Sequence, residues 1–314
     1  MNYILYVVVP CYNEEEVLLE TSSRLLAKLN ILVSKQIISA KSKILFVDDG
    51  SKDATWQMIK SFNEKNKMVT GVKLSNNKGH QNALMAGIMT AMQKADIVIS
   101  MDADLQDDIE VIDDMICKYS DGCDIVYGVR KNRDKDSFWK RFTANTFYKM
   151  MNWLGAKTVS NHADYRLMSK RALEALSGYK EVNLFMRGMI PTLGFKSGIV
   201  YYERAERFAG ESKYTIGKMF SLAINGATSF SVKPIRMITW LGFFVFIGSI
   251  AIFIYSLIRH FMGETIRGWT TLMVSIWAIG GLILLALGVV GEYIGKIYLE
   301  TKGRPRYIIE EYID

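Results

Sequence analysis

Short apolar runs alternate with helical patterns through the first 130 residues of the chain. The apolar runs are rich in residues that favour buried strands, and they lie at 5–9, 44–47, 71–74, 97–101 and 125–128. The helical patterns between them lie near 14–30, 53–66, 80–94 and 108–120. This alternation predicts an α/β fold whose mostly parallel sheet is covered by helices on both faces. We expect the first strand to end at Pro10.

Polar residues follow each of the first four predicted strands. The clusters are Pro-Cys-Tyr-Asn-Glu at 10–14, Asp-Asp-Gly-Ser at 48–51, Asn-Asn-Lys-Gly-His at 76–80 and Asp-Ala-Asp at 102–104. In open parallel sheets, ligands bind at the carboxyl ends of the strands. The sequence therefore predicts one site at one edge of the sheet, built from these four clusters.

Two long apolar segments follow later in the chain. The charge-free runs 237–258 and 268–291 are each long enough to cross the core of a bilayer. Residues 215–236 are predicted to form an amphipathic helix at the membrane interface. Basic residues flank the pair of runs on what we expect to be the cytoplasmic side, at Lys233, Arg236, Lys296, Lys302, Arg304 and Arg306. We therefore divide the chain into a globular domain (1–214), an interfacial region (215–236) and a two-span region with a short cytoplasmic tail (237–314).

Composition and charge restrict the class of protein further. Hydrophobic residues make up 50% of the chain and charged residues 23%, which excludes disordered, collagen-like and disulfide-rich secreted proteins. The net charge is −5 over residues 1–129 and +10 over residues 130–218, which suggests a cation site beside a surface for anions. The two apolar runs favour a lipid phosphate over nucleic acid as that anion. The cysteines have no metal-ligand spacing, so we expect them to be reduced and cytosolic.

The acidic segment 102–108 directly follows an apolar strand. Alternate carboxylates at a strand end can converge on a hard cation, and Mg²⁺ typically takes one or two carboxylates together with substrate phosphates. The alternative is a solvated turn whose acids cap the next helix, as we expect for Asp107 and Asp108. The segment 48–51 likewise either forms a capping turn or offers carboxylates to the hydrogen-bond donors of a nucleoside.

Taken together and in order, these clusters resemble the family 2 glycosyltransferases with a GT-A, Rossmann-like fold. The chain is most similar to the branch that acts on polyprenyl phosphates, the bactoprenol glucosyltransferases and dolichyl-phosphate mannose synthases. The resemblance covers nearly the whole chain and also includes the segments 127–130, 164–168, 207–214 and 229–231 and the two-span tail. It implies a metal-dependent enzyme that transfers glucose or N-acetylglucosamine, with inversion, from a UDP-sugar to undecaprenyl phosphate. The reaction would take place at the cytoplasmic face of the cell membrane, in a multi-pass protein.

The resemblance also implies roles for individual residues. The nucleotide-binding positions are Pro10, Tyr12, Glu14, Asp49, Lys78, Gly79 and Asp102, with Asp49 on the base. The positions around a divalent cation, Mg²⁺ or Mn²⁺, are Asp102, Asp104 and Gln106. The positions for the acceptor phosphate are Arg130, Arg141 and Asn145, the last of which is Ser in some relatives. The positions that close over the diphosphate are Arg207 and Lys213, and those assigned to catalysis are Asp104, Asp164 and Arg130.

The chemistry of the implied reaction leaves the role of Asp164 open. A polyprenyl monophosphate is mostly a dianion at pH 7, because its second pKa is about 6. Such a nucleophile has no proton to lose, so a strong general base is optional. Asp164 therefore either orients the acceptor or the sugar, assists proton transfer, or pairs structurally with Arg166. His80 and His162 lie beside motifs and are either functional or structural.

Several alternatives stay open at this point. The donor could be GDP-mannose or a UDP-4-amino-4-deoxyarabinose derivative, and the chain could be a membrane adaptor that binds sugar nucleotide without catalysis. A dinucleotide-dependent dehydrogenase is excluded, because no Gly-x-Gly-x-x-Gly turn follows the first strand. The expected partners are the donor, the lipid acceptor and the bilayer, without nucleic acid. A homo-oligomer is also expected, because glycines in the two apolar runs allow close helix packing, at Gly242, Gly248, Gly280, Gly281 and Gly288.

Overall fold

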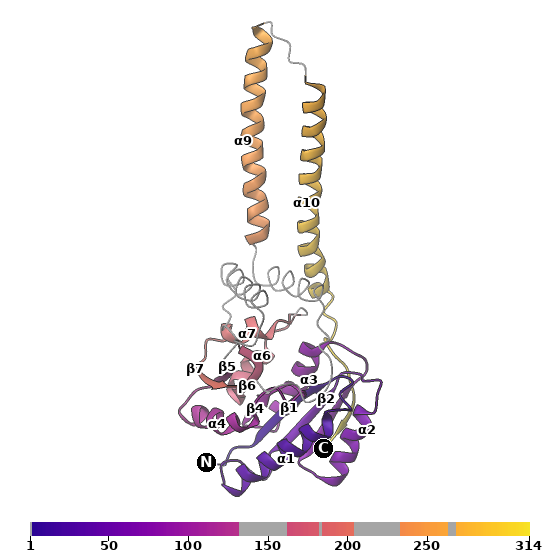
Figure 1. Cartoon of the computed structure of the whole chain (residues 1–314), viewed down its shortest axis with the longest axis vertical. Helices are drawn as coiled ribbons and strands as arrows, with labels where there is room; N and C mark the ends of the chain where they lie inside the picture. The colour runs from indigo at the N-terminus through magenta and orange to yellow at the C-terminus, as the bar shows by residue number, and fades with distance from the viewer. Residues whose placement is uncertain (1, 132–161, 182–183, 204–232, 263–267) are drawn as a thin grey trace. The chain divides into compact units, whose positions relative to one another are not determined.

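The computed structural model describes residues 2–131, 162–181, 184–203, 233–262 and 268–314 (Figure 1). The chain divides into two compact units. One is an α/β unit that contains the sheet and also includes residues 305–314. The other contains two long helices, α9 (Lys233–Phe261) and α10 (Trp269–Thr301).

The α/β unit is built on a sheet of eight strands in the order β7-β5-β6-β4-β1-β2-β3-β8. The strands are β1 (Leu5–Cys11), β2 (Lys43–Asp48), β3 (Val69–Leu74), β4 (Ile97–Ser100), β5 (Ile125–Arg130), β6 (His162–Ser169), β7 (Ser197–Tyr202) and β8 (Ile309–Ile313). β1 pairs in parallel with β2 and β4, β2 with β3, and β5 with β7. β6 is antiparallel to both β4 and β5, and β8 is antiparallel to β3. The sheet is therefore mixed, and the prediction of a mostly parallel sheet holds for its central strands β4, β1, β2 and β3.

The predicted helices and strands of the first 130 residues are confirmed in type. The helices are α1 (Leu18–Ser34), α2 (Thr55–Lys65), α3 (His80–Met92), η1 (Ile109–Val111) and α4 (Ile112–Ser120), followed by α6 (Lys170–Ser177) and α7 (Met186–Thr192). Every residue of β1 is buried, as expected for a central strand that is covered on both faces. A Cβ at Gly87 would lie 2.5 Å from side-chain atoms of Val8 and Val47, so glycine there lets α3 pack closely on β1 and β2.

The first strand continues through Pro10 to Cys11, so the prediction that Pro10 ends it was wrong. The oxygen of Val8 accepts a hydrogen bond from the backbone N–H of Met101, and the pairing of β1 with β4 ends at Val8. Because backbone groups alternate in direction along a strand, Pro10 faces the same side as Val8, beyond the last pair. The nitrogen of Pro10 therefore faces no ladder acceptor, and proline is tolerated.

The last residues of the chain form β8, although the sequence analysis assigned them to a short tail. Three acidic residues of this segment pair with lysines of the sheet, of α2 and of the turn after α3. Asp314 contacts Lys43 and Lys94 at 2.5 Å each, Glu311 contacts Lys60 at 2.8 Å, and Glu310 contacts Lys73 at 3.1 Å. β8 therefore covers the edge of the sheet at β3.

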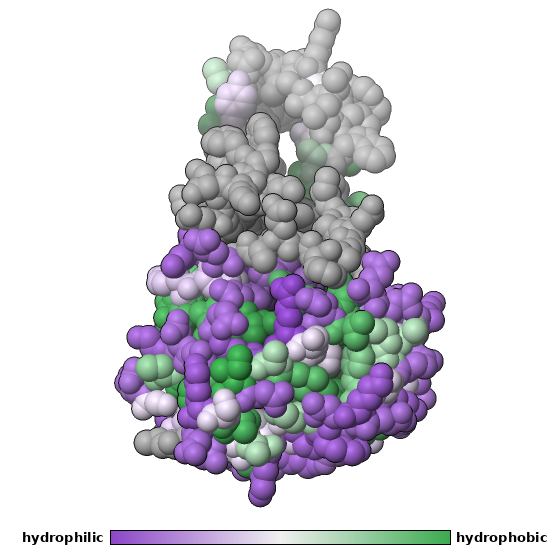
Figure 2. Space-filling view, turned by 60° about the horizontal axis from the view of Figure 1, so that its bottom comes forward, coloured by the Kyte–Doolittle hydropathy of each residue, from purple (hydrophilic) through white to green (hydrophobic). Residues whose placement is uncertain are grey.

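The surfaces of the two units differ in character. On the face of the α/β unit that Figure 2 shows, hydrophilic residues dominate and hydrophobic ones form patches between them. Large apolar side chains are exposed along α9 and α10, for example Phe244 (66%) and Leu284 (71%). Among the described residues one segment, Ala278–Thr301, is long and apolar enough to cross a membrane, and the apolar segment of α9, Ile235–Val245, is shorter. The predicted span over 237–258 therefore stays a prediction, and the boundaries at 214 and 215 lie outside the described residues.

Candidate functional site

The loops after β1 and β2 are joined by hydrogen bonds. The backbone N–H of Asn13 donates to Ser51 Oγ at 3.0 Å, and that of Glu14 donates to Thr55 Oγ1 at 3.0 Å. In return, Asn13 Oδ1 accepts from the backbone N–H of Lys52 at 2.9 Å. These bonds hold the segment around Glu14 against the loop after β2, so the first two predicted clusters do meet.

Asp49 joins the loop after β2 to the loop after β3. Its Oδ1 accepts from the backbone N–H of Lys78 at 2.7 Å, and its Oδ2 accepts from that of Gly79 at 2.9 Å. Burial raises the pKa of the Asp49 carboxyl, although the two N–H donors act to lower it. Asp49 therefore orders the backbone of two further nucleotide-binding candidates, and its contact with a base stays a prediction.

Gly50 lies where these two loops meet. Its φ is +69°, and a Cβ there would lie 2.7 Å from the backbone nitrogen of Asn77. Both the left-handed backbone and the close approach to another main chain therefore require glycine. Gly194 has a similar φ of +72°, but no atom lies within 4 Å of its Cβ position among the described residues.

We expect Gly50→Ala to lower the free energy of unfolding more than Gly194→Ala does. A left-handed alanine costs about 1–2 kcal/mol in both variants. At Gly50 the clash with a rigid backbone adds about 1–3 kcal/mol. The measurement is thermal unfolding of the two full-length variants in the same detergent. Equal losses would show that the loops after β2 and β3 do not approach each other as described.

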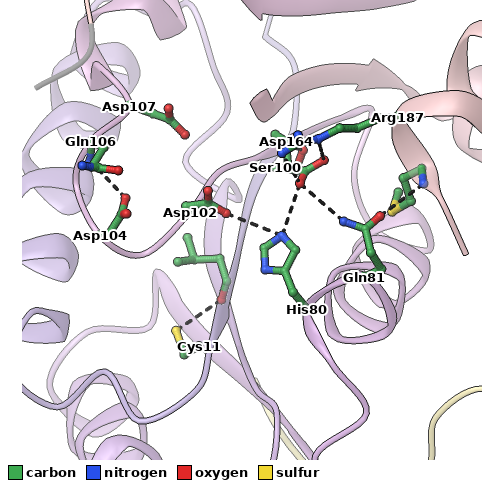
Figure 3. A network of polar contacts seen from close by, with 12 residues as sticks. Cys11, His80, Gln81, Ser100, Asp102, Asp104, Gln106, Asp107, Asp164 and Arg187 are labelled. Carbon is green, nitrogen blue, oxygen red and sulfur yellow. Dashed lines mark hydrogen bonds and ion pairs between the residues drawn. The ribbon is translucent and has the colours of Figure 1, made fainter. Parts of the chain in front are cut away.

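His80, the first residue of α3, lies between two carboxylates (Figure 3). Its Nε2 is 3.6 Å from Asp102 Oδ1 and 3.5 Å from Asp164 Oδ2. Burial alone would lower the pKa of the imidazole, but the hydrogen bond to Asp164 and the charges of both carboxylates raise it to about 9. At neutral pH His80 is therefore a cation within the predicted site. A functional role for His80 stays a prediction.

Asp164, on β6, is 4% exposed and is surrounded by cations. It is hydrogen-bonded to Arg166 Nη2, and its Oδ2 accepts from Arg187 Nη2 at 3.1 Å. Burial raises the pKa of this carboxyl, but Arg187, Arg166 and His80 together hold it well below its usual range. The predicted pairing with Arg166 is confirmed. A carboxyl with so low a pKa is a weak proton acceptor, which argues against a role in proton transfer, and the orientation of a substrate stays a prediction.

Asp102 and Asp104 lie on the turn that follows β4. Leu105 has a φ of +56°, which is unusual for a residue with a bulky side chain, and Asp104 Oδ1 accepts from the backbone N–H of Gln106 at 3.2 Å. Within the described part of the chain, no three His, Cys, Asp or Glu side chains are grouped closely enough to hold a metal ion. The oxygen donors present are nonetheless the type that Mg²⁺ and Mn²⁺ prefer. Burial raises the pKa of the Asp102 carboxyl, and the charges of Asp164 and Asp104 raise it further, whereas His80 acts to lower it. A bound cation would oppose the repulsion between Asp102 and Asp104.

Asp107 does not cap the helix that follows it, which corrects the sequence interpretation. Asp108 is the cap, because its Oδ1 accepts from the backbone N–H of Glu110 at 2.9 Å. Asp107 is 3% exposed, and its Oδ1 accepts from the hydroxyl of Tyr202 and lies 3.6 Å from Arg130 Nη2. Burial raises the pKa of its carboxyl to about 6, although Tyr202 and Arg130 act to lower it. The helix pattern alone could not reveal this orientation, because the partners come from β5 and β7.

The structure therefore brings most of the predicted residues to one edge of the sheet. The half-buried ones, which solvent reaches, are Tyr12, Glu14, Lys78, Gly79, Asp102, Asp104 and Arg130, and the buried ones are Pro10, Asp49, Gln106 and Asp164. Four predicted residues lie outside the described part of the chain, namely Arg141, Asn145, Arg207 and Lys213. Gln81, Arg187 and Tyr202 lack a local motif and were not predicted. Their contacts reveal them, and Gln81 Nε2 donates to Asp164 Oδ2 at 3.4 Å.

Comparison with known proteins gives a family and several close relatives. The family described as "Glycosyl transferase family 2" matches residues 6–177. The "Uncharacterized glycosyltransferase YkoT" of Bacillus subtilis (strain 168) is 54% identical over 307 residues, which cover 98% of this chain and 91% of that protein. The "Prophage bactoprenol glucosyl transferase homolog" of Escherichia coli (strain K12) is 40% identical over 308 residues, which cover 96% of this chain and 97% of that protein.

Solved structures resemble the fold. The crystal structure of mannosyl-3-phosphoglycerate synthase from Rubrobacter xylanophilus matches with a TM-score of 0.50 and 16% sequence identity, over 75% of this chain and 74% of that one. At this identity the likeness concerns the fold alone. Together with the observed sheet, it confirms the expected GT-A, Rossmann-like α/β fold of the first unit.

Proposed function

Because the chain belongs to glycosyl transferase family 2, we propose that it transfers a sugar from a nucleotide diphosphate to polyprenyl phosphate. The relative from Escherichia coli, which matches over nearly the whole chain, is named as a homologue of bactoprenol glucosyl transferase, and this name supports a polyprenyl acceptor. The same resemblance favours UDP-glucose or UDP-N-acetylglucosamine as the donor, undecaprenyl phosphate as the acceptor, and inversion at the anomeric carbon.

The observation that carries this proposal is the turn after β4. Asp102 and Asp104 on this turn are the candidates for the donor side, and Asp107 on the same turn lies 3.6 Å from Arg130, the candidate for the acceptor phosphate. One short segment therefore carries candidate residues for the donor and contacts the candidate residue for the acceptor. A transfer reaction needs this, because two anionic groups must be held close together.

Different residues bind the two substrates. Asp49, Lys78 and Gly79 hold the nucleotide, together with Tyr12 and Glu14 on the loop after β1. A divalent cation bound by Asp102, Asp104 and Gln106 would act as a Lewis acid toward the leaving diphosphate. Arg130, with Arg141 and Asn145, binds the acceptor phosphate, and Arg207 and Lys213 close over the diphosphate. The acceptor is already a dianion, so the low pKa of Asp164 is compatible with the reaction.

The helical unit supports a site of action at the cytoplasmic face of the cell membrane. The exposed apolar side chains of α9 and α10 need a non-aqueous cover, and a bilayer supplies one. We therefore place two spans in the membrane, one for each helix. Basic residues flank them on the cytoplasmic side, and the glycines of both helices would allow an oligomer.

The decisive experiment identifies the product. The full-length protein, purified in detergent, is incubated with undecaprenyl phosphate, Mg²⁺ and one of four donors: UDP-glucose, UDP-N-acetylglucosamine, GDP-mannose or a UDP-4-amino-4-deoxyarabinose derivative. When the donor is a UDP-hexose, we expect the organic extract to contain lipid whose mass has increased by one sugar. Donor binding without lipid-linked sugar from any donor would instead indicate an adaptor that only binds the nucleotide.

A further inference from the structure

Residues from three separate elements meet at Arg130. Arg130 is the last residue of β5, and it is in register with Tyr202, the last residue of β7. Arg130 Nε donates to Tyr202 Oη at 3.2 Å, and the hydroxyl of Tyr202 in turn donates to Asp107 Oδ1. Arg130 Nη2 also lies 3.6 Å from Asp107 Oδ1. The three side chains therefore form a closed triangle in which each one contacts the other two.

The directions of the hydrogen bonds in this triangle are determined by chemistry. A guanidinium only donates and an ionised carboxylate only accepts, so the hydroxyl of Tyr202 must accept from Arg130 and donate to Asp107. The tyrosine side chain is 2% exposed, and its ring packs edge-on against Tyr165 at a centroid distance of 5.5 Å. The hydroxyl is therefore held at one place, and it holds the guanidinium in turn.

The contacts that Arg130 makes with other described residues leave the outer end of the guanidinium for a ligand. Nε is occupied by Tyr202, whereas the 3.6 Å between Nη2 and Asp107 is longer than a hydrogen bond. The Arg130 side chain is 26% exposed, so it is accessible from solvent. A phosphate is best bound by two parallel N–H groups of a guanidinium, which requires that its plane be oriented beforehand.

We infer that Tyr202 and Asp107 are positioning residues that orient Arg130 for the phosphate of the acceptor. This inference rests on the proposed function, which assigns the acceptor phosphate to Arg130. It adds a second consequence, because Asp107 lies on the turn that carries Asp102 and Asp104. A residue that orients the acceptor arginine therefore lies on the same turn as the candidates for the donor side.

A merely structural triangle would behave differently from a positioning one. Loss of a structural contact lowers the stability of the protein and weakens the binding of both substrates. Loss of a positioning contact acts through Arg130 alone and weakens the binding of the acceptor. The KM values for donor and acceptor distinguish the two cases, and so does a double-mutant cycle with Arg130.

The test uses Tyr202→Phe, which removes the hydroxyl and keeps the ring. We expect the KM for undecaprenyl phosphate to rise about 10-fold, because a hydrogen bond to a charged group is lost. The KM for the nucleotide sugar should stay the same. The matched control is Tyr201→Phe, since Tyr201 is the preceding residue of the same strand and is 56% exposed. This control should change neither constant.

The cycle completes the test. Arg130→Ala should itself raise the acceptor KM, and adding Tyr202→Phe to Arg130→Ala should then have no further effect. A full 10-fold effect in that background, or an equal rise in the KM of both substrates, would overturn the positioning role. If Arg130→Ala leaves the acceptor KM unchanged, the assignment of Arg130 in the proposed function fails instead. If Arg130→Ala raises the acceptor KM and Tyr202→Phe leaves it normal, the positioning role alone is overturned. If the wild-type protein has no transfer activity, the positioning role and the proposed function are both overturned.

Discussion

Asp104→Asn is expected to lower the rate of sugar transfer by about 10²–10³-fold while the protein stays folded. The amide of the variant would keep an oxygen that can accept from the backbone N–H of Gln106, so the turn should survive. The lost negative charge is the one that would hold the cation and, through it, the leaving diphosphate. Turnover is measured with donor and acceptor both saturating, at several Mg²⁺ concentrations.

Asp108→Asn is the matched control for this experiment. Asp108 lies four residues further along the same acidic segment, and its Oδ1 caps η1. Asparagine caps a helix about as well as aspartate does, so this variant should keep both its stability and its turnover. Near-normal turnover of Asp104→Asn would refute the assignment of the cation to Asp104. A loss of turnover in Asp108→Asn as large as that in Asp104→Asn would mean that the charge of the whole segment matters, without a specific site.

Asp164→Asn is expected to lower the free energy of unfolding by about 3–5 kcal/mol. Arg166 is fully buried, and its Nε and Nη1 have no hydrogen-bond partner within the described part of the chain. Asp164 is the carboxylate that this guanidinium contacts, so an amide in its place leaves a buried positive charge without compensation. Arg187 and His80 lose the same partner. Chemical denaturation of the full-length protein, followed by circular dichroism, measures the change.

Glu20→Gln provides the comparison for an exposed ion pair. Glu20 contacts Arg24 at 2.6 Å, with side chains that are 39% and 52% exposed, and such a solvent-accessible pair contributes about 0–1 kcal/mol. If Asp164→Asn fails to fold, the stability of the double variant Asp164→Asn with Arg166→Met is measured instead, because this variant also removes the buried positive charge. We expect the double variant to recover part of the lost stability. Equal stability of Asp164→Asn and the wild type would contradict the structural part of the role of Asp164.

The meeting of the four polar clusters could be predicted because it follows from strand direction. Parallel strands bring their carboxyl ends to the same edge, so 10–14, 48–51, 76–80 and 102–104 had to converge once β1 to β4 were recognised. β6 could not be oriented in the same way. The segment that forms β6 mixes polar residues such as Asp164 and Arg166 with apolar ones, and it was not predicted as a strand. It runs antiparallel between β4 and β5, a direction that no local pattern marks.

The role of Asp107 shows where local pattern misleads. An acid just before a helix predicts a cap, and this holds for Asp108. The neighbouring Asp107 instead contacts Arg130 and Tyr202, which lie 23 and 95 residues further along the chain. β8 was missed for the same reason, because it is recognised by its pairing with β3, which lies far from it in the sequence.

By itself the sequence determined the alternation of strands and helices, the position of the site at the ends of the strands, and the two apolar segments. These features depend on local periodicity, and residues close in sequence decide them. Only the tertiary structure decided that His80 and Arg187 surround Asp164, and that Tyr202 and Asp107 hold Arg130. Those contacts depend on the order of the strands in the sheet, because strand order decides which distant side chains become neighbours at its edge.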